Sequence, residues 1–217
     1  MNNQKQQRMR FIFLLLGCST VALAQGPEQA KYLLNQVSVE IKKQKNLRLE
    51  FQYVLENKEE QIKQETEGKV TLAGDQYKLE FLEVIQLFDG KKTYTIVPEN
   101  EEITVSIPEE GEAISVNPSK LLSFYEEGYD YHWDISQRVM GRNIQFVKLI
   151  PSEENEDIQY LLLGIDVAKN SIYRLIEIGN NKTTTTLTII NQEENISLPE
   201  DYFEFNSSEY PNFYINN

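Results

Sequence analysis

Apolar and polar residues alternate one by one in many separate stretches of this chain, and this pattern most limits how it can fold. Side chains of a β-strand point to opposite faces in turn, so the alternation predicts strands with one apolar face. The first stretch sets Leu47, Leu49, Phe51, Tyr53 and Leu55 against Arg48, Glu50 and Gln52. A sheet of such strands must curl its apolar face around something or expose that face to water.

The alternation returns in a series of short segments that are joined by turns. Asp89-Gly90 is typical of a hairpin turn, and residues 73–76 and 98–102 have the composition of connections. These features predict an antiparallel meander. Its strands are expected within residues 47–55, 70–72, 77–81, 85–87, 94–96 and 103–107.

One amphipathic helix is expected before the meander. Pro27 suits the first turn of a helix, where its missing N–H costs no hydrogen bond. Apolar residues then follow at spacings of three and four, which is the period of one helix face. These residues are Ala30, Leu33, Leu34, Val37 and Ile41.

A segment rich in proline, glycine and acidic residues interrupts the sheet pattern between Pro108 and Trp133. Within it, Asn117 can cap a short helix that has Pro118 at its first position. The segment therefore predicts a helical insertion in the sheet. Strand patterns resume afterwards at residues 144–150, 159–167, 172–178, 183–190 and 203–205.

Acidic residues gather in four clusters, and we expect all four in solvated connections between strands. Calcium binding is the alternative, although none of the clusters has the ligand order of a known calcium loop. The clusters are residues 99–102, 109–112, 153–157 and 193–194.

The first residues have the features of an export signal. A basic start is followed by an apolar run from Phe11 and by the small-residue cleavage site Ala22-Leu23-Ala24. We therefore predict a cleavable signal peptide at 1–24, a periplasmic location, and one domain at 25–217. The alternative is lipoprotein-type processing at Leu15–Cys18, which would leave a lipid anchor on Cys18, the only cysteine.

The formal net charge of −13 argues against nucleic acid as a partner, because both surfaces would be negative. Anionic lipid headgroups would be repelled in the same way. We expect a soluble monomer, since no other segment is long and apolar enough to span a membrane.

Residue types that usually carry catalysis are scarce. His132 is the only histidine, which excludes a site with several histidine ligands, and no nucleophile-elbow or phosphate-loop motif occurs. We predict no enzymatic activity, no metal and no cofactor. The aromatic cluster Tyr129–Asp134 is expected to pack the end of the insertion against the sheet, and a sugar-binding or acid–base site is the alternative.

Several stretches, in this order, resemble the LolA family of periplasmic lipoprotein carriers. Together they extend over nearly the whole chain after the signal peptide, although each motif alone is short. They are the first strand Leu47–Tyr53, the glycine-led pair Glu67–Glu80, the hairpin Phe88–Pro98, the central helix start Pro118–Leu122, and the closing strand Phe203–Phe205 with Tyr210-Pro211. Three residues depart from the family, since Ala73 and Gly74 replace a basic residue and a proline that help latch the lid, and Tyr94 replaces a tryptophan.

The resemblance implies an α+β fold, an incomplete and half-open antiparallel β-barrel covered by a helical lid. It also implies a carrier that takes acylated lipoproteins from an inner-membrane releasing transporter to an outer-membrane acceptor. The alternative on the same fold is a lipid-sensing regulatory domain or a membrane-anchored lipoprotein acceptor, which lipidation of Cys18 would favour.

The expected acyl-binding cavity would be lined by one inward-facing set of apolar residues, each of which could instead simply fill the core. The set lacks any basic residue, which suits loose holding of hydrocarbon. Its members are Leu47, Leu49, Phe51, Tyr53, Val70, Leu72, Tyr77, Leu79, Phe81, Ile85, Leu87, Tyr94, Ile96, Ile103 and Val105, with Leu121, Leu122, Phe124 and Tyr125 under the lid.

Overall fold

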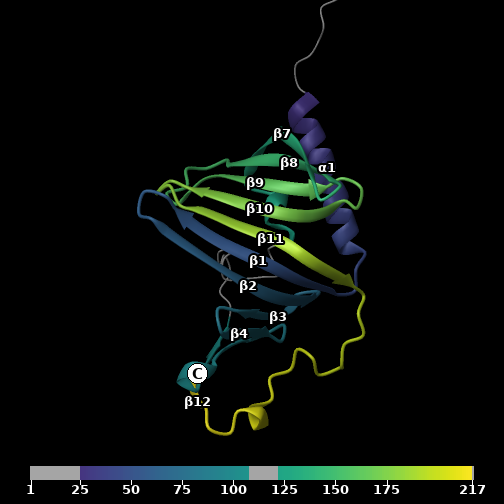
Figure 1. Ribbon diagram of the computed structural model, residues 1–217. Helices are drawn as coiled ribbons and strands as arrows, with labels where there is room; N and C mark the ends of the chain where they lie inside the picture. Colours follow the sequence, from purple (N-terminus) through teal and green to yellow (C-terminus); the bar gives the residue numbers. More distant parts are fainter. Residues whose placement is uncertain (1–24, 108–121, 217) are drawn as a thin grey trace, which may run out of the picture.

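The computed structural model describes residues 25–107 and 122–216, so the predicted leader, Cys18, Leu121 and the capped helix at Asn117 lie outside the described residues. The described part consists of one α-helix, three short 3-10 helices and a twelve-stranded sheet (Figure 1). In chain order the elements are α1 (Gln25–Lys42), β1 (Leu47–Asn57), β2 (Ile62–Ala73), β3 (Gln76–Phe81), β4 (Val84–Phe88), β5 (Thr93–Val97), η1 (Pro98–Asn100), β6 (Glu102–Ser106), η3 (Phe124–Glu126), β7 (Tyr129–Val139), β8 (Arg142–Pro151), β9 (Ile158–Asp166), β10 (Ser171–Gly179), β11 (Thr184–Glu194), η4 (Ser207–Glu209) and β12 (Tyr214–Asn216).

The strands form one open, curved sheet in the order β12-β6-β5-β4-β3-β2-β1-β11-β10-β9-β8-β7. Every neighbouring pair is antiparallel except β12 and β6, which run parallel. The chain therefore makes two meanders, β1 to β6 and β7 to β11, and the pairing of β1 with β11 joins them. This architecture confirms the predicted fold class, a mostly β structure with an open antiparallel sheet and a helical cover.

Helix α1 lies across one face of β7 to β10, which we call the inner face (Figure 1). The apolar face of the helix that was predicted from the sequence packs against the sheet, because Ala30, Leu34 and Val37 are almost fully buried there. From the sheet, Leu149 and Leu163 complete this cluster and are fully buried. Burial of an aliphatic side chain contributes about 1.5–3 kcal/mol, so the helix is held mainly by this contact.

Local hydrogen bonds and a glycine stabilise the turns of the first meander. Asp89 accepts hydrogen bonds from the backbone N–H groups of Lys91 and Lys92, both at 2.8 Å, and so closes the predicted hairpin turn. Gly74 has φ 58° in the β2–β3 turn, a left-handed conformation that glycine adopts without a steric penalty. These local signals explain why the order of the strands was readable in the sequence.

The insertion is shorter than predicted, because Tyr129 to Val139 form the edge strand β7. Alternating aromatic residues open this strand, and a β-bulge between Trp133 and Ser136 then shifts its register against β8. The bulge breaks the period of two, which hid the strand from the sequence pattern.

The chain end also differs from expectation. Residues 203–205 do not form a strand, and the short strand at the end is β12, which pairs with β6. Residues 196–213 form an irregular segment, which we call the strap, that leads from the end of β11 past β3 and β4 to β12 (Figure 1). In the second meander the expected connection at 193–194 is also wrong, since both residues belong to β11.

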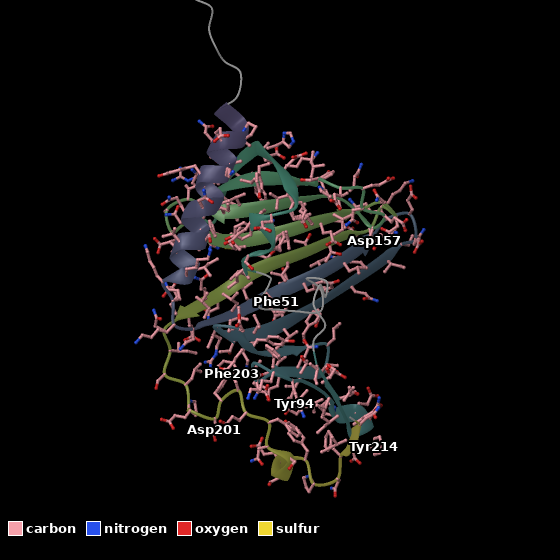
Figure 2. The ribbon with its side chains drawn as sticks, turned by 180° about the vertical axis from the view of Figure 1, so that it is seen from behind. Phe51, Tyr94, Asp157, Asp201, Phe203 and Tyr214 are labelled. Carbon is pink, nitrogen blue, oxygen red and sulfur yellow. The ribbon has the colours of Figure 1, made fainter. Side chains whose placement is uncertain are left out.

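The strap covers the outer face of the first meander, opposite to the side of α1. The Tyr202 hydroxyl lies 3.1 Å from the Thr71 hydroxyl, and the Phe205 ring stacks on Tyr94 at 4.4 Å between centroids. Phe203 is buried, and Figure 2 places it with Tyr94 at the same end of the molecule. The apolar and aromatic side chains of the strap thus give the outer face of β2 to β6 a core of its own.

Candidate functional site

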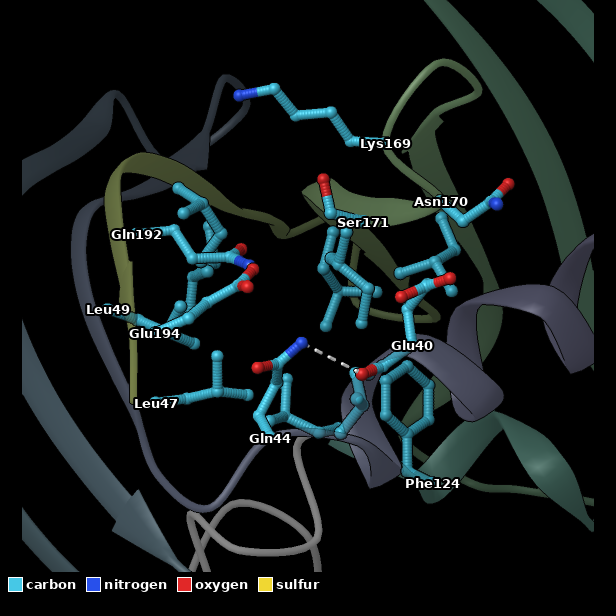
Figure 3. Close-up of a pocket in the computed structure, with 17 residues that line it drawn as sticks. Glu40, Gln44, Leu47, Leu49, Phe124, Lys169, Asn170, Ser171, Gln192 and Glu194 are labelled. Atoms are coloured by element: carbon cyan, nitrogen blue, oxygen red, sulfur yellow. Dashed lines mark hydrogen bonds between the residues drawn. The ribbon is translucent and has the colours of Figure 1, made fainter. Parts of the chain in front are cut away.

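A cavity of about 360 Å³ lies between the inner face of the sheet and the C-terminal half of α1 (Figure 3). This volume is within the usual range for small-ligand pockets, at its lower end. Its floor is apolar, with side chains from α1, β1, β9, β10, β11 and the segment around η3. These are Ile41, Leu47, Leu49, Leu122, Phe124, Leu163, Ile172, Leu175, Leu187 and Ile189.

The register explains why these side chains converge. The pairing of β1 with β11 has a register shift between Glu50 and Phe51. Leu49 of β1 lies before this shift, and Ile189 of β11, the partner of Phe51, lies after it. Leu175 of β10 lies opposite both Leu187 and Leu163, so one row of leucines crosses three strands. The sheet therefore supplies a continuous aliphatic surface where α1 and η3 stand away from it.

Polar side chains surround the mouth of this cavity. They are Glu40, Gln44, Lys169, Asn170, Ser171, Gln192 and Glu194. In Figure 3 Lys169 extends across one end of the opening, while Glu40 and Glu194 lie on opposite sides of it. Glu40 is paired with Lys43 at 2.7 Å, whereas Lys169 takes part in no ion pair within residues 25–107 and 122–216.

A second cavity of about 360 Å³ adjoins the first; eight of the thirteen residues that line it are polar or charged, and we call it the polar cavity. Ile41, Gln44, Leu47 and Leu122 line both cavities, so the two share a wall. The remaining lining comes from α1 and the connection after it, from the end of β2 and the β2–β3 turn, and from η3 and the residue before it. It consists of Ser38, Lys42, Lys45, Asn46, Leu72, Gly74, Asp75, Ser123 and Glu126.

Hydrogen bonds hold η3 against α1 beside these cavities. Glu126 accepts a hydrogen bond from the Ser38 hydroxyl and forms an ion pair with Lys42 at 3.0 Å. The Ser38 hydrogen bond and, next to it, the Lys42 ammonium lower the pKa of the Glu126 carboxyl. The Tyr131 hydroxyl donates to the backbone oxygens of Tyr125 and Glu126, both at 2.9 Å, so β7 holds the same segment from the other side.

Tyr125 anchors η3 in the core beneath α1 at the cost of one hydrogen bond. Its side chain is 1% exposed, and its hydroxyl has no partner among the described residues. Burial, with a smaller contribution from Glu126, strongly raises the pKa of this phenol. An unsatisfied buried hydroxyl lowers the stability of a fold by about 1–3 kcal/mol. The Tyr125 ring is therefore well buried, but its hydroxyl is destabilising.

The structure brings only part of the predicted lining set to the two cavities. Leu47, Leu49, Leu122 and Phe124 line the apolar cavity, and Leu72 joins Leu47 and Leu122 in the polar one. Tyr125 belongs to the core under α1. The other members on the inner face pack in a neighbouring cluster on β1 to β3, and they are Phe51, Tyr53, Val70, Tyr77, Leu79 and Phe81.

Six members of the predicted set lie on the outer face, so the expectation of a single inward-facing set is wrong for them. In the β3–β4 pairing, Phe88 stands opposite Tyr77, and Leu87 stands opposite Lys78. Leu87 therefore shares a face with Lys78, and the same register carries this face through β5 and β6. The six are Ile85, Leu87, Tyr94, Ile96, Ile103 and Val105.

The second meander contributes floor residues that the predicted set did not include. Leu163, Leu175 and Leu187 lie in segments that were expected to be strands, but their facing was not assigned. The alternation within each segment was visible in the sequence. The sequence pattern did not predict the pairing of β1 with β11, which places these leucines beside Leu47 and Leu49.

Only part of the aromatic cluster Tyr129–Asp134 packs into the core as predicted. Tyr129 and Tyr131 pack against the core under α1, whereas His132 and Trp133 are exposed. Within the described ranges, no group of three or more His, Cys, Asp or Glu side chains could hold a metal ion. In those same ranges, no helix combines the length and apolar character needed to cross a membrane.

No family model matches the chain, and no curated protein matches it in sequence. Among solved structures, an uncharacterised conserved protein of Thermus thermophilus aligns with a TM-score of 0.58 and 11% identity, over 84% of this chain and 96% of that one. A LolA superfamily protein of Nitrosomonas europaea aligns with a TM-score of 0.42 and 10% identity, over 81% and 97%. The lipoprotein LppX of Mycobacterium tuberculosis aligns with a TM-score of 0.41 and 11% identity, over 79% and 98%. The Thermus thermophilus protein therefore shares its fold with this chain, at low sequence identity.

Proposed function

We propose that the apolar cavity holds acyl chains, and that the protein carries acylated lipoproteins through the periplasm from an inner-membrane transporter to an outer-membrane acceptor. The observation that carries the proposal is the cavity itself, with an aliphatic floor and a polar mouth between sheet and helix. The residue-level resemblance to the lipoprotein carriers supplies the choice of cargo, donor and acceptor.

The chemistry of the floor suits reversible binding of hydrocarbon. Each methylene removed from water contributes about 0.8 kcal/mol, so an acyl chain gains affinity from area alone. The ten floor residues include no charged or strongly hydrogen-bonding side chain, so the polar groups of a cargo find nothing to bind deep inside. Such a site can pass its cargo to a more apolar acceptor without breaking polar contacts.

The segment at η3 forms one side of the site and offers a way to enlarge it. Leu122 and Phe124 line the cavity, and the next residue is the poorly paired anchor Tyr125. Release of the Glu126 contacts with Ser38 and Lys42 would free this segment from α1. Longer or branched chains would then be admitted by outward movement of η3.

The test is displacement of an apolar fluorescent probe, N-phenyl-1-naphthylamine, by fatty acids. The variants Leu175→Glu and Leu187→Glu place a charge on the floor at positions that are only half-buried, so the sheet should still form. We expect probe binding to fall at least tenfold, since a buried unpaired charge costs several kcal/mol. Circular dichroism confirms that the fold survives.

The matched control is Ile190→Glu, which makes the same kind of change on β11 next to a floor residue. Ile190 is 55% exposed and does not line the cavity, so probe binding should be unchanged. Equal binding by the floor variants and this control would contradict the acyl site. Mass spectrometry of lipids and lipoproteins that co-purify from the periplasm tests the cargo, and their absence would contradict the carrier role.

A further inference from the structure

The polar cavity next to the acyl site is not needed to hold hydrocarbon, yet it equals the apolar cavity in volume, about 360 Å³ each. The two cavities share Ile41, Leu47 and Leu122, whereas the charged residues Lys42, Lys45, Asp75 and Glu126 border only the second one. A molecule with a hydrocarbon tail and a polar head would match this change in lining from one cavity to the next.

The charges around the polar cavity are balanced. Lys42 and Lys45 stand against Asp75 and Glu126. Lys42 and Glu126 are paired with each other at 3.0 Å, and Ser38 also donates to Glu126, so these two groups are largely satisfied. Lys45 and Asp75 have no ion pair or side-chain hydrogen bond among the described residues, apart from the backbone contact of Lys45 with Asn195.

The polar cavity therefore offers one unpaired ammonium and one unpaired carboxylate among the described residues, held on different elements. Lys45 follows the end of α1, and Asp75 lies in the β2–β3 turn. A head group of net charge zero that carries both a phosphate and an amine would satisfy both. A purely anionic head would leave Asp75 unpaired and would approach a chain of net charge −13.

We infer that this polar cavity is a head-group site, and that the cargo of the protein extends to zwitterionic phospholipids of the phosphoethanolamine type. The phosphate lies toward Lys45, the amine lies toward Asp75, and the acyl chain passes along Leu47 and Leu122 into the apolar cavity. The inference rests on the proposed acyl-binding function and names a class of lipid that the function alone leaves open.

The test compares lysophospholipids of equal chain length that differ only in the head. Their ability to displace the naphthylamine probe from the wild-type protein is measured for the ethanolamine head, the glycerol head and an uncharged monoacylglycerol. We expect the ethanolamine lipid to bind roughly two- to fivefold more tightly than either of the others, because each exposed charge contributes modestly.

Two variants then assign this preference to the polar cavity. Lys45→Gln and Asp75→Asn should each reduce the preference toward unity while leaving probe and monoacylglycerol affinity unchanged. The matched controls are Lys31→Gln and Asp130→Asn, which remove the same charges from exposed positions outside both cavities and should keep the preference.

The outcomes separate this inference from the proposed function. Equal affinity for the three lipids in the wild type would overturn the head-group site while the acyl site stands. The head-group site is likewise overturned if the preference survives in Lys45→Gln and Asp75→Asn, or is lost instead in Lys169→Gln at the other mouth. Failure of every lipid to displace the probe would overturn the acyl site itself.

Discussion

The second meander and strands β4 to β6 use the same alternating pattern, yet the segments that cover them lie on opposite sides of the sheet. In the second meander α1 covers the inner face, and Val37, Leu149 and Leu163 are fully buried there. Across β4 to β6 of the first meander the strap covers the outer face, and Ile96 and Ile103 are as deeply buried as the helix contacts. At β4 to β6 the face that becomes core is therefore the one that the strap covers.

Truncation of Ile103 gives the largest effect and tests the core of the strap-covered half. Ile103 is fully buried, so Ile103→Ala should lower the free energy of unfolding by about 2–5 kcal/mol. Leu149→Ala, under the helix, should cost a similar amount. Urea denaturation measures both, and the naphthylamine probe should bind Ile103→Ala normally. Weakened binding with unchanged stability would mean that the outer face, and not only the inner face, holds ligand.

The inner face of the first meander is expected to be solid around Gly68, in contrast to the hollow under α1. A Cβ at Gly68 would lie 2.4 Å from the Phe51 ring and 2.9 Å from Phe81. Gly68→Ala should therefore destabilise the protein by about 1–3 kcal/mol through overpacking. Thermal unfolding checks this, and an unchanged or raised melting temperature would point to open space between these rings.

The half of the sheet that α1 covers contains one buried hydroxyl without a hydrogen-bond partner among the described residues, and one substitution should remove it. Tyr125→Phe deletes the unpaired hydroxyl and keeps the ring in place, so we expect a gain in stability of about 1–3 kcal/mol. Tyr131→Phe is the contrasting variant, because the single proton of the Tyr131 hydroxyl is shared between two backbone oxygens and its loss should destabilise the protein. A loss of stability in Tyr125→Phe would show that this hydroxyl has a partner in solution.

The smallest expected effect concerns the contact between α1 and η3. Since the pKa of Glu126 is lowered in the folded state, its contribution is present at neutral pH and is lost as the pH falls through that lowered pKa. Glu126→Gln should cost at most about 1 kcal/mol at neutral pH, because the pair is partly exposed. The difference from the wild type should disappear in acid, and a difference that is constant with pH would exclude this carboxylate as the cause.

The sequence predicts strand order better than strand facing, for a physical reason. Turn residues such as Asp89 and Gly74 act locally, and alternation within Leu47–Leu55 needs no partner to be recognised. The facing of Leu87 or Ile103 depends on the strap, which joins the sheet about a hundred residues later and has no regular period. An irregular covering segment leaves no pattern that would reveal its place.

Only some residues of the candidate site could be predicted from the sequence, for a related reason. Leu47 and Leu49 were expected in a lining because they belong to the clearest alternating stretch. Leu163, Leu175 and Leu187 lie in equally clear stretches, but they reach the cavity only through the pairing of β1 with β11. The charges of Lys45 and Asp75 stand in a connection and a turn, where polar residues are ordinary and carry no signal.

The two edges of the open sheet are formed by strands of different kinds. An open sheet has two terminal strands with free backbone groups, which can recruit strands of other molecules into aggregates. Here β12 occupies one end as a parallel partner of β6, and the bulge between Trp133 and Ser136 distorts β7 at the other. A three-residue strand at one edge and a distorted strand at the other each offer a neighbouring molecule little straight backbone to pair with.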